Sequence, residues 1–255
     1  MPLPSSDHRP VAPPGFDYGD YGAFKAGSSA SPSTGLRRLA KALGVRNRYL
    51  RFLETANREQ PALEIGCGDG SFLVVLMDAG FTRIRGVEPS PSYQEIVPAG
   101  TIVRCYAQEY LAQAPDASIG TVVALDVFEH IPAGELRQLL GLLYEKLVPG
   151  GLLMFRVPNL AGGLGLFNYH GDLSHVTALN EVSLRQLAFG SAFGGFSVHA
   201  EPLAYPRSFA GLAGLLLWPP YRICTQAVLA AFGIRARVLS PNLVCVMTKA
   251  LGPRG

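Results

Sequence analysis

Two groups of residues in this chain have the types and the spacing needed for chemistry. The first is a turn with glycines at positions 66, 68 and 70, which follows the apolar run 62–65 and leads into a helix near Ser71. Glycine adopts positive φ and lets a ligand approach the main chain, while the first amides of a helix are unpaired donors. The turn therefore predicts a cofactor-binding edge.

The spacing of this turn excludes two common phosphate sites. A P-loop needs Lys-Ser or Lys-Thr after its last glycine, whereas Ser71-Phe72 follows here. The dinucleotide fingerprint Gly-x-Gly-x-x-Gly is also absent, and Asp69 would repel a pyrophosphate at the start of the helix. The turn suits a cofactor that carries a cation rather than phosphates.

The second group is His170-x-Asp172-x-x-His175, in the loop after a predicted strand at 152–157. A carboxylate beside an imidazole fixes its tautomer and raises its basicity, so His175 oriented by Asp172 is the leading general base, with His170 as the second candidate. Two alternatives stay open. The three side chains could bind a divalent metal, or Asp172 could cap a turn while the histidines contact substrate hydroxyls or the backbone.

Strands and helices alternate between residues 62 and 157, and this alternation predicts a parallel sheet with helices on both faces and ligands at the carboxyl ends of the strands. One or two amphipathic helices precede it at 35–57. The predicted strands are 62–66, 83–88, 101–105, 120–125, 152–157, 195–204 and 242–249, and the predicted helices are 70–79, 91–97, 134–146 and 180–190.

The glycine turn also resembles a known family. Glu64-Ile-Gly66-Cys-Gly68-Asp-Gly70 matches motif I, (D/E)xGxGxG, of the class I S-adenosylmethionine-dependent methyltransferases, and three later stretches, 84–90, 122–131 and 147–157, resemble that family's further motifs in order. The resemblance implies S-adenosyl-L-methionine as cofactor. It also implies a Rossmann-like α/β fold with a mostly parallel seven-stranded sheet, helices on both faces and an antiparallel last strand.

The resemblance assigns roles within the cofactor pocket. Glu88 would accept both ribose hydroxyls, and it lies close to the roughly 20-residue spacing from the turn that such a carboxylate needs. Ala107 and Gln108 match positions that contact adenine, and Leu125 would present its carbonyl to the methionine end. Asp126 would approach the methionine ammonium or cap the next helix. The full set is Glu64, Gly66, Gly68, Gly70, Glu88, Ala107, Gln108, Leu125 and Asp126.

Residues 169–177, with the helix that follows them, are similar to the region after strand five in methyltransferases of bacterial polysaccharide and glycolipid biosynthesis. The similarity implies O-methylation of a sugar hydroxyl, on a soluble or lipid-linked acceptor. One alternative is an acceptor such as a quinone, a polyketide or another apolar small molecule. The other is a non-catalytic binding subunit that keeps the cofactor fold and dimerises through residues 208–233.

The composition of the chain bears on its domain size, its partners and its cellular compartment. A chain of 255 residues is long enough for one large α/β domain, and its net charge of +3 with scattered basic residues predicts no nucleic-acid partner. The four cysteines form no Cys-x-x-Cys pair, which favours reduced thiols. We expect a cytoplasmic protein, because no basic segment followed by an apolar run marks a secretion signal.

Two segments differ in composition from the predicted domain at 35–255. Residues 1–34 are rich in Pro, Gly and Ser with interspersed aromatics, which predicts a flexible arm that closes over the site as a lid or packs on the outside. Residues 208–233 are apolar, but Pro219, Pro220 and Arg222 divide them into two pieces too short to span a bilayer. Two short helices there could lie at the inner face of a membrane, pack on the core or join a second subunit.

Overall fold

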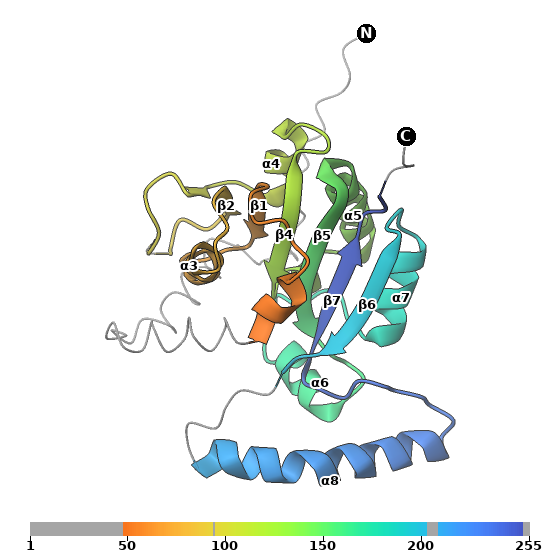
Figure 1. Ribbon diagram of the computed structural model, residues 1–255. Coiled ribbons are helices and arrows are strands. Elements are labelled where there is room, and N and C mark those ends of the chain that lie inside the picture. The colour runs from red at the N-terminus through yellow and green to blue at the C-terminus, as the bar shows by residue number, and fades with distance from the viewer. Residues whose placement is uncertain (1–47, 94, 203–208, 252–255) are drawn as a thin grey trace.

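The computed structural model describes residues 48–93, 95–202 and 209–251. The predicted arm at 1–34 lies outside these residues. A seven-stranded sheet forms the centre of the molecule, with helices on both of its faces (Figure 1). Its strands are β1 (Ala62–Ile65), β2 (Ile84–Val87), β3 (Ile102–Val103), β4 (Ile119–Leu125), β5 (Leu147–Pro158), β6 (Gly195–Ala200) and β7 (Asn242–Thr248).

The sheet is mixed, with the order β3-β2-β1-β4-β5-β7-β6. The first five strands pair in parallel, and β7 runs antiparallel to both of its neighbours, β5 and β6. The chain order reverses between β1 and β4, which is the point where open α/β sheets bind ligands at the strands' carboxyl ends. The predicted fold class, a mostly parallel seven-stranded sheet, is confirmed.

The helices cover the two faces of the sheet and bury two apolar clusters. One cluster includes Leu136, Leu139 and Leu143, which recur at helical spacing along one face of α5. The other includes Phe72 and Leu76 of α3. The helices are α3 (Ser71–Asp78), α4 (Ala107–Gln113), α5 (Ala133–Lys146), α6 (Gly163–His170), α7 (Glu181–Phe189) and α8 (Phe209–Ala231), with 3-10 turns η1 (Leu50–Leu53) and η2 (Phe128–His130).

The segment after β2 differs from its prediction. A helix was expected at 91–97, but the described residues there form turns. The guanidinium of Arg104 donates hydrogen bonds to the carbonyls of Ser90 and Tyr93, and it forms a 2.7 Å ion pair with Glu95. These contacts fasten the segment after β2 to the residue that follows β3.

The apolar region near the C-terminus also differs from its prediction. The sequence predicted two helices separated at Trp218-Pro-Pro-Tyr221, whereas the structure has one helix, α8, that includes both prolines. Two adjacent prolines remove backbone donors within a single turn, so the hydrogen-bonded turns on either side persist. Among the described residues, none of the helices combines the length and the apolar character that crossing a membrane requires.

Candidate cofactor and acceptor site

The glycine turn has the backbone geometry that its residue types predict. Gly66, Gly68 and Gly70 have φ values of +67°, +54° and +86°, a region that other residues rarely adopt. A Cβ at position 66 would lie 2.5 Å from Cγ2 of Val127, in the loop after β4. Gly66 therefore allows two loops at the carboxyl end of the sheet to touch, which shapes the floor of the site.

Glu88 connects the end of β2 to this turn. One of its carboxylate oxygens accepts a 3.0 Å hydrogen bond from the amide of Gly68, and the other accepts a 2.9 Å bond from the amide of Ser90. Each oxygen keeps a second lone pair that could accept a ribose hydroxyl. Burial raises the pKa of Glu88, although the two amides and Arg104 partly oppose this shift.

Glu64 lies at the end of β1 and is buried. Burial raises the pKa of this carboxyl well above its usual value, and the charges of Asp69 and Glu88 raise it further. Within the described part of the chain, its Oε2 atom has no hydrogen-bond partner. Asp69 and Glu88 thus lie close to Glu64 around one turn, and such an acidic lining suits a cationic ligand.

The two predicted adenine contacts open α4, directly after β3 and its short loop. Ala107 is buried and Gln108 is half-buried. The Tyr106 amide donates to the side chain of Glu109 at 3.0 Å, which satisfies one of the free donors at the start of the helix. The structure thus places Ala107 and Gln108 at the same edge of the sheet as Glu88.

Leu125 ends β4, and Asp126 follows it with φ of +57°. The carboxylate of Asp126 does not cap η2; both of its oxygens accept hydrogen bonds from Arg156 of β5, one of them at 2.6 Å. The αL backbone turns the carboxylate toward this arginine, and Asp tolerates that conformation better than most residues. The ion pair lies at the carboxyl ends of two neighbouring strands.

Arg156 belongs to a polar cluster that the sequence did not predict. Its guanidinium also donates to the hydroxyl of Tyr49 at 2.7 Å and to Glu201 at 3.0 Å, and Asn242 donates to Glu201 at 2.7 Å. Burial raises the pKa of Tyr49 to about 12. These residues are far apart in the sequence, so only the sheet topology could have brought them together.

The tautomer of His175 can be read from the contacts of its ring nitrogens. Its Nδ1 atom is 2.7 Å from the carbonyl oxygen of Tyr169, which can only accept, so Nδ1 carries the proton. Nε2 then keeps its lone pair, and it lies 3.9 Å from carboxylate oxygens of both Glu129 and Asp172. The sequence pattern indicated Asp172 as the partner of His175 and gave no sign of Glu129.

Asp172 acts mainly through its own loop. Its Oδ1 atom accepts hydrogen bonds from the amide and the hydroxyl of Ser174, at 3.0 and 2.6 Å. The same hydroxyl lies 2.8 Å from Nδ1 of His130, and because its proton goes to Asp172, it accepts from that nitrogen. The amides of Val176 and Thr177 donate to the carbonyl of Glu129 and fasten this loop to η2.

His170 does not join this cluster. It ends α6, is exposed, and packs its ring edge-on against Tyr169. Within the described residues, the group of side chains with ligand atoms close enough to hold a metal is Glu129, His130 and His175, whose atoms lie within 4.8 Å of one another. Both Nδ1 atoms are engaged by oxygen atoms, so both Nε2 atoms could face an ion. The possible metal ligands indicated by the sequence were His170, Asp172 and His175, and of these only His175 belongs to this group.

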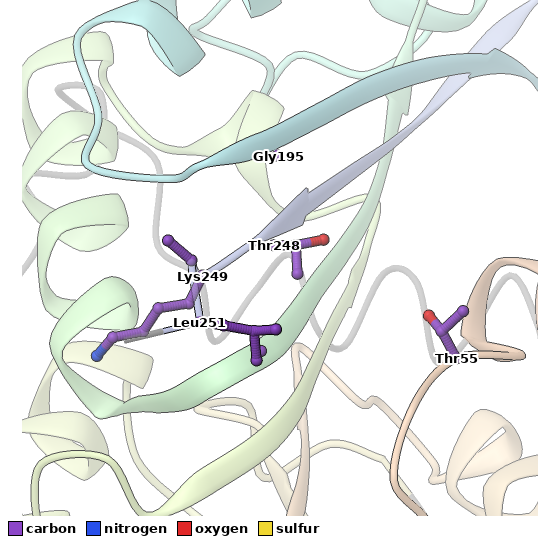
Figure 2. Close-up of a pocket in the computed structure, with 7 residues that line it drawn as sticks. Thr55, Gly195, Thr248, Lys249 and Leu251 are labelled. Carbon is purple, nitrogen blue, oxygen red and sulfur yellow. The ribbon is translucent and has the colours of Figure 1, made fainter. Parts of the chain in front are cut away.

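A separate cavity lies at the other end of the sheet. Figure 2 shows Thr248, Lys249 and Leu251 around it, with Thr55 across from them. The ammonium of Lys249 already donates to the carbonyls of Tyr144 and Leu147, at 2.8 Å each. None of its lining residues belongs to the glycine turn, and its charged lining residue, Lys249, is already engaged by these carbonyls.

The glycine turn and the buried carboxylate after β2 lie at the switch point of the sheet, which is where open α/β proteins bind their ligands. A family model described as a methyltransferase domain matches residues 36–194, which is more than half of the chain. The chain belongs to this methyltransferase-domain family. It is a S-adenosyl-L-methionine-dependent methyltransferase, with that sulfonium nucleoside as its cofactor.

Solved structures share the fold. A SAM-dependent methyltransferase from Archaeoglobus fulgidus is 21% identical with a TM-score of 0.63, and the match covers 82% of this chain and 94% of that one. A possible histamine N-methyltransferase from Thermotoga maritima is 17% identical with a TM-score of 0.55, over 82% and 90% of the two chains. A Haemonchus contortus phosphoethanolamine N-methyltransferase with bound S-adenosyl-L-methionine is 13% identical with a TM-score of 0.56, over 92% and 60%. A search of curated proteins gives no match.

Proposed function

We propose that this methyltransferase transfers the methyl group to a hydroxyl of a sugar in a glycolipid or polysaccharide precursor. The observation that carries the proposal is the position of the His175 imidazole, whose Nδ1 atom lies 2.7 Å from the Tyr169 carbonyl oxygen and whose Nε2 atom lies 3.9 Å from Glu129. A sugar hydroxyl is a poor nucleophile until a base accepts its proton.

The residues present can perform this reaction in line. When bound, the cofactor would supply a methyl group on a sulfonium, so that the acceptor oxygen could bond to the methyl carbon while the electron pair of the C–S bond leaves on sulfur. His175 Nε2 accepts the hydroxyl proton, and Glu129 stabilises the resulting imidazolium. Glu88 and the glycine turn hold the nucleoside so that attack is in line.

The surface around α6 favours an acceptor with both polar and apolar parts. Leu164, Leu166 and Phe167 of α6 and Leu173 after it are exposed next to the polar groups of Tyr169 and His175. A lipid-linked sugar would place its hydroxyl at the histidine and its chain along these residues. The same apolar residues also suit a quinone or polyketide, which is the second candidate.

The test incubates the full chain with S-adenosylmethionine labelled in its methyl group and with lipid-linked sugars, soluble sugars, or apolar phenolic acceptors. We expect label in the lipid-linked sugar, bound through an ether that survives mild base. Label only in the phenolic acceptor would select the second candidate. Label in none of the three would reject the sugar proposal while leaving cofactor binding to be measured separately.

A further inference from the structure

We infer that α8 and the loop after it, residues 209–241, dock on the surface of an anionic lipid bilayer. Helix α8 lies beyond α6, apart from the sheet, on the side where the parallel strands end (Figure 1). Its half-buried residues recur at helical spacing, at Leu215, Trp218, Tyr221 and Leu229. This stripe faces the body, since the Tyr221 hydroxyl lies 3.6 Å from the position of a Cβ on Gly162.

The remaining surface of the helix and its exit is apolar and open. Leu216 is 70% exposed, Ile223 67% and Phe232 80%, and Leu212, Leu217, Val228 and Ile234 are also largely exposed. Isolated apolar residues on a surface need no explanation, but a continuous set along one helix marks an interaction surface. Among the described residues, none of the helices is long and apolar enough to cross a membrane, so the exposed apolar side chains of α8 suit the surface of a bilayer.

The distribution of charged residues along the chain favours an anionic partner for this surface. Residues 202–255 contain six basic residues and no Asp or Glu, whereas residues 1–201 contain 16 basic and 19 acidic residues. Arg222, Arg235 and Arg237 are exposed on α8 or just after it. Anionic lipid headgroups attract arginines that lie close to the membrane surface. They would balance the positive charge of residues 202–255, which contain no acidic residue.

The same charges disfavour a second copy as the occupant. In a twofold dimer the same patch meets itself, so these arginines would face one another with no carboxylate from residues 202–255 to pair with them. A bilayer provides both the apolar layer for the leucines and the opposite charge. The docking surface does not depend on the proposed acceptor, although it would bring the site close to a lipid-linked one.

The experiment measures co-sedimentation of the full chain with phosphatidylcholine vesicles and with phosphatidylcholine–phosphatidylglycerol vesicles. We expect binding to the anionic vesicles that weakens as salt is raised. Absence of binding to anionic vesicles would overturn the proposal.

Matched variants test the two parts of the surface. Leu216→Glu and Phe232→Glu should each lower the binding constant about tenfold or more, because each removes an inserted apolar side chain. Phe189→Glu, on α7 and 95% exposed, is the control and should change nothing. Arg235→Glu should lower binding at least about fivefold, whereas Arg137→Glu, exposed on α5, should not.

Two further outcomes would also overturn the proposal. Equal binding by the α8 variants and the wild type would show that another surface meets the lipid. A dimer in sedimentation equilibrium that Leu216→Glu dissociates, together with no vesicle binding, would show that a second copy covers this face. Because all the substituted residues are exposed, thermal melting should confirm that each variant keeps the wild-type fold.

Discussion

The carboxylate of Glu88 accepts a 3.0 Å hydrogen bond from the amide of Gly68, so the acidic residue after β2 and the glycine turn after β1 form one rigid unit. Its other oxygen is held by the Ser90 amide. A carboxylate fixed in this way is already oriented before a nucleoside binds, and little ordering remains to be done on binding.

Replacing Glu88 should therefore weaken cofactor binding directly. Hydrogen bonds to a charged group contribute about 1.5–3 kcal/mol, so Glu88→Ala should lower S-adenosylmethionine affinity by roughly 10-fold to 100-fold in calorimetry. Glu181→Gln, on α7, serves as the control and should bind like the wild type. Unchanged affinity in Glu88→Ala would show that the ribose is held elsewhere.

The pH dependence of cofactor binding follows from the same carboxyl group. Burial raises the pKa of Glu88 above its usual value, and only the ionised form offers all its lone pairs to the two ribose hydroxyls. Affinity should therefore be full at neutral pH and fall as the pH is lowered through this raised pKa. Calorimetry across that range should show a fall in the wild type and a flatter profile in Glu88→Gln.

A substitution at Gly66 tests the contact between the loop after β1 and the loop after β4. Gly66→Ala would place a Cβ 2.5 Å from Val127 and impose positive φ on alanine, which should cost about 1–3 kcal/mol in stability and reduce cofactor binding. Gly141→Ala is the matched control, because it lies in α5 with open space around it and should stabilise the protein by about 1 kcal/mol. Equal melting temperatures for the two variants would contradict this assignment.

The sequence predicted the sheet and the glycine turn because both depend on local patterns. Apolar runs such as 62–65 mark buried strands, and positive φ at Gly68 follows from its residue type. The pairing of Arg156 with Asp126, Tyr49 and Glu201 could not be predicted, since it depends on which strands lie side by side. Asp172, the partner of His175 that the sequence indicated, lies 3.9 Å from its Nε2 atom. Glu129 lies at the same distance and was missed for a similar reason, because it reaches His175 through the contact of η2 with a loop some 45 residues later.

The Arg156 cluster should make stability depend on pH. Although burial raises the pKa of Glu201, Arg156 and the Tyr49 and Asn242 hydrogen bonds lower it below its usual value overall. A carboxyl whose pKa is depressed on folding contributes stability above its unfolded pKa, and this contribution is lost as the pH falls through the folded value. Denaturant unfolding should show about 2 kcal/mol less stability for Glu201→Gln than for the wild type at pH 7 and a smaller difference in acid. A difference independent of pH would contradict the ionic role.

His175 is the residue on which the proposed chemistry depends. His175→Ala should lower the rate of methyl transfer by about 10²-fold to 10⁴-fold, the range expected for loss of a general base, while cofactor affinity changes little. Glu129→Gln should lower the rate less, because the imidazole keeps its tautomer through Tyr169. His170→Ala is the control, since that ring is exposed at the end of α6.

Removal of metal ions by a chelator distinguishes between two roles for Nε2 of His175, that of a general base and that of a metal ligand. If Nε2 of His175 accepts the hydroxyl proton, it cannot also donate its lone pair to an ion, so the two roles exclude each other. With His175 as base, extensive treatment with EDTA should leave the rate of methyl transfer unchanged. Loss of activity on chelation that Mg²⁺ or Mn²⁺ restores would assign Glu129, His130 and His175 to a metal site, and the hydroxyl would then be activated by the ion.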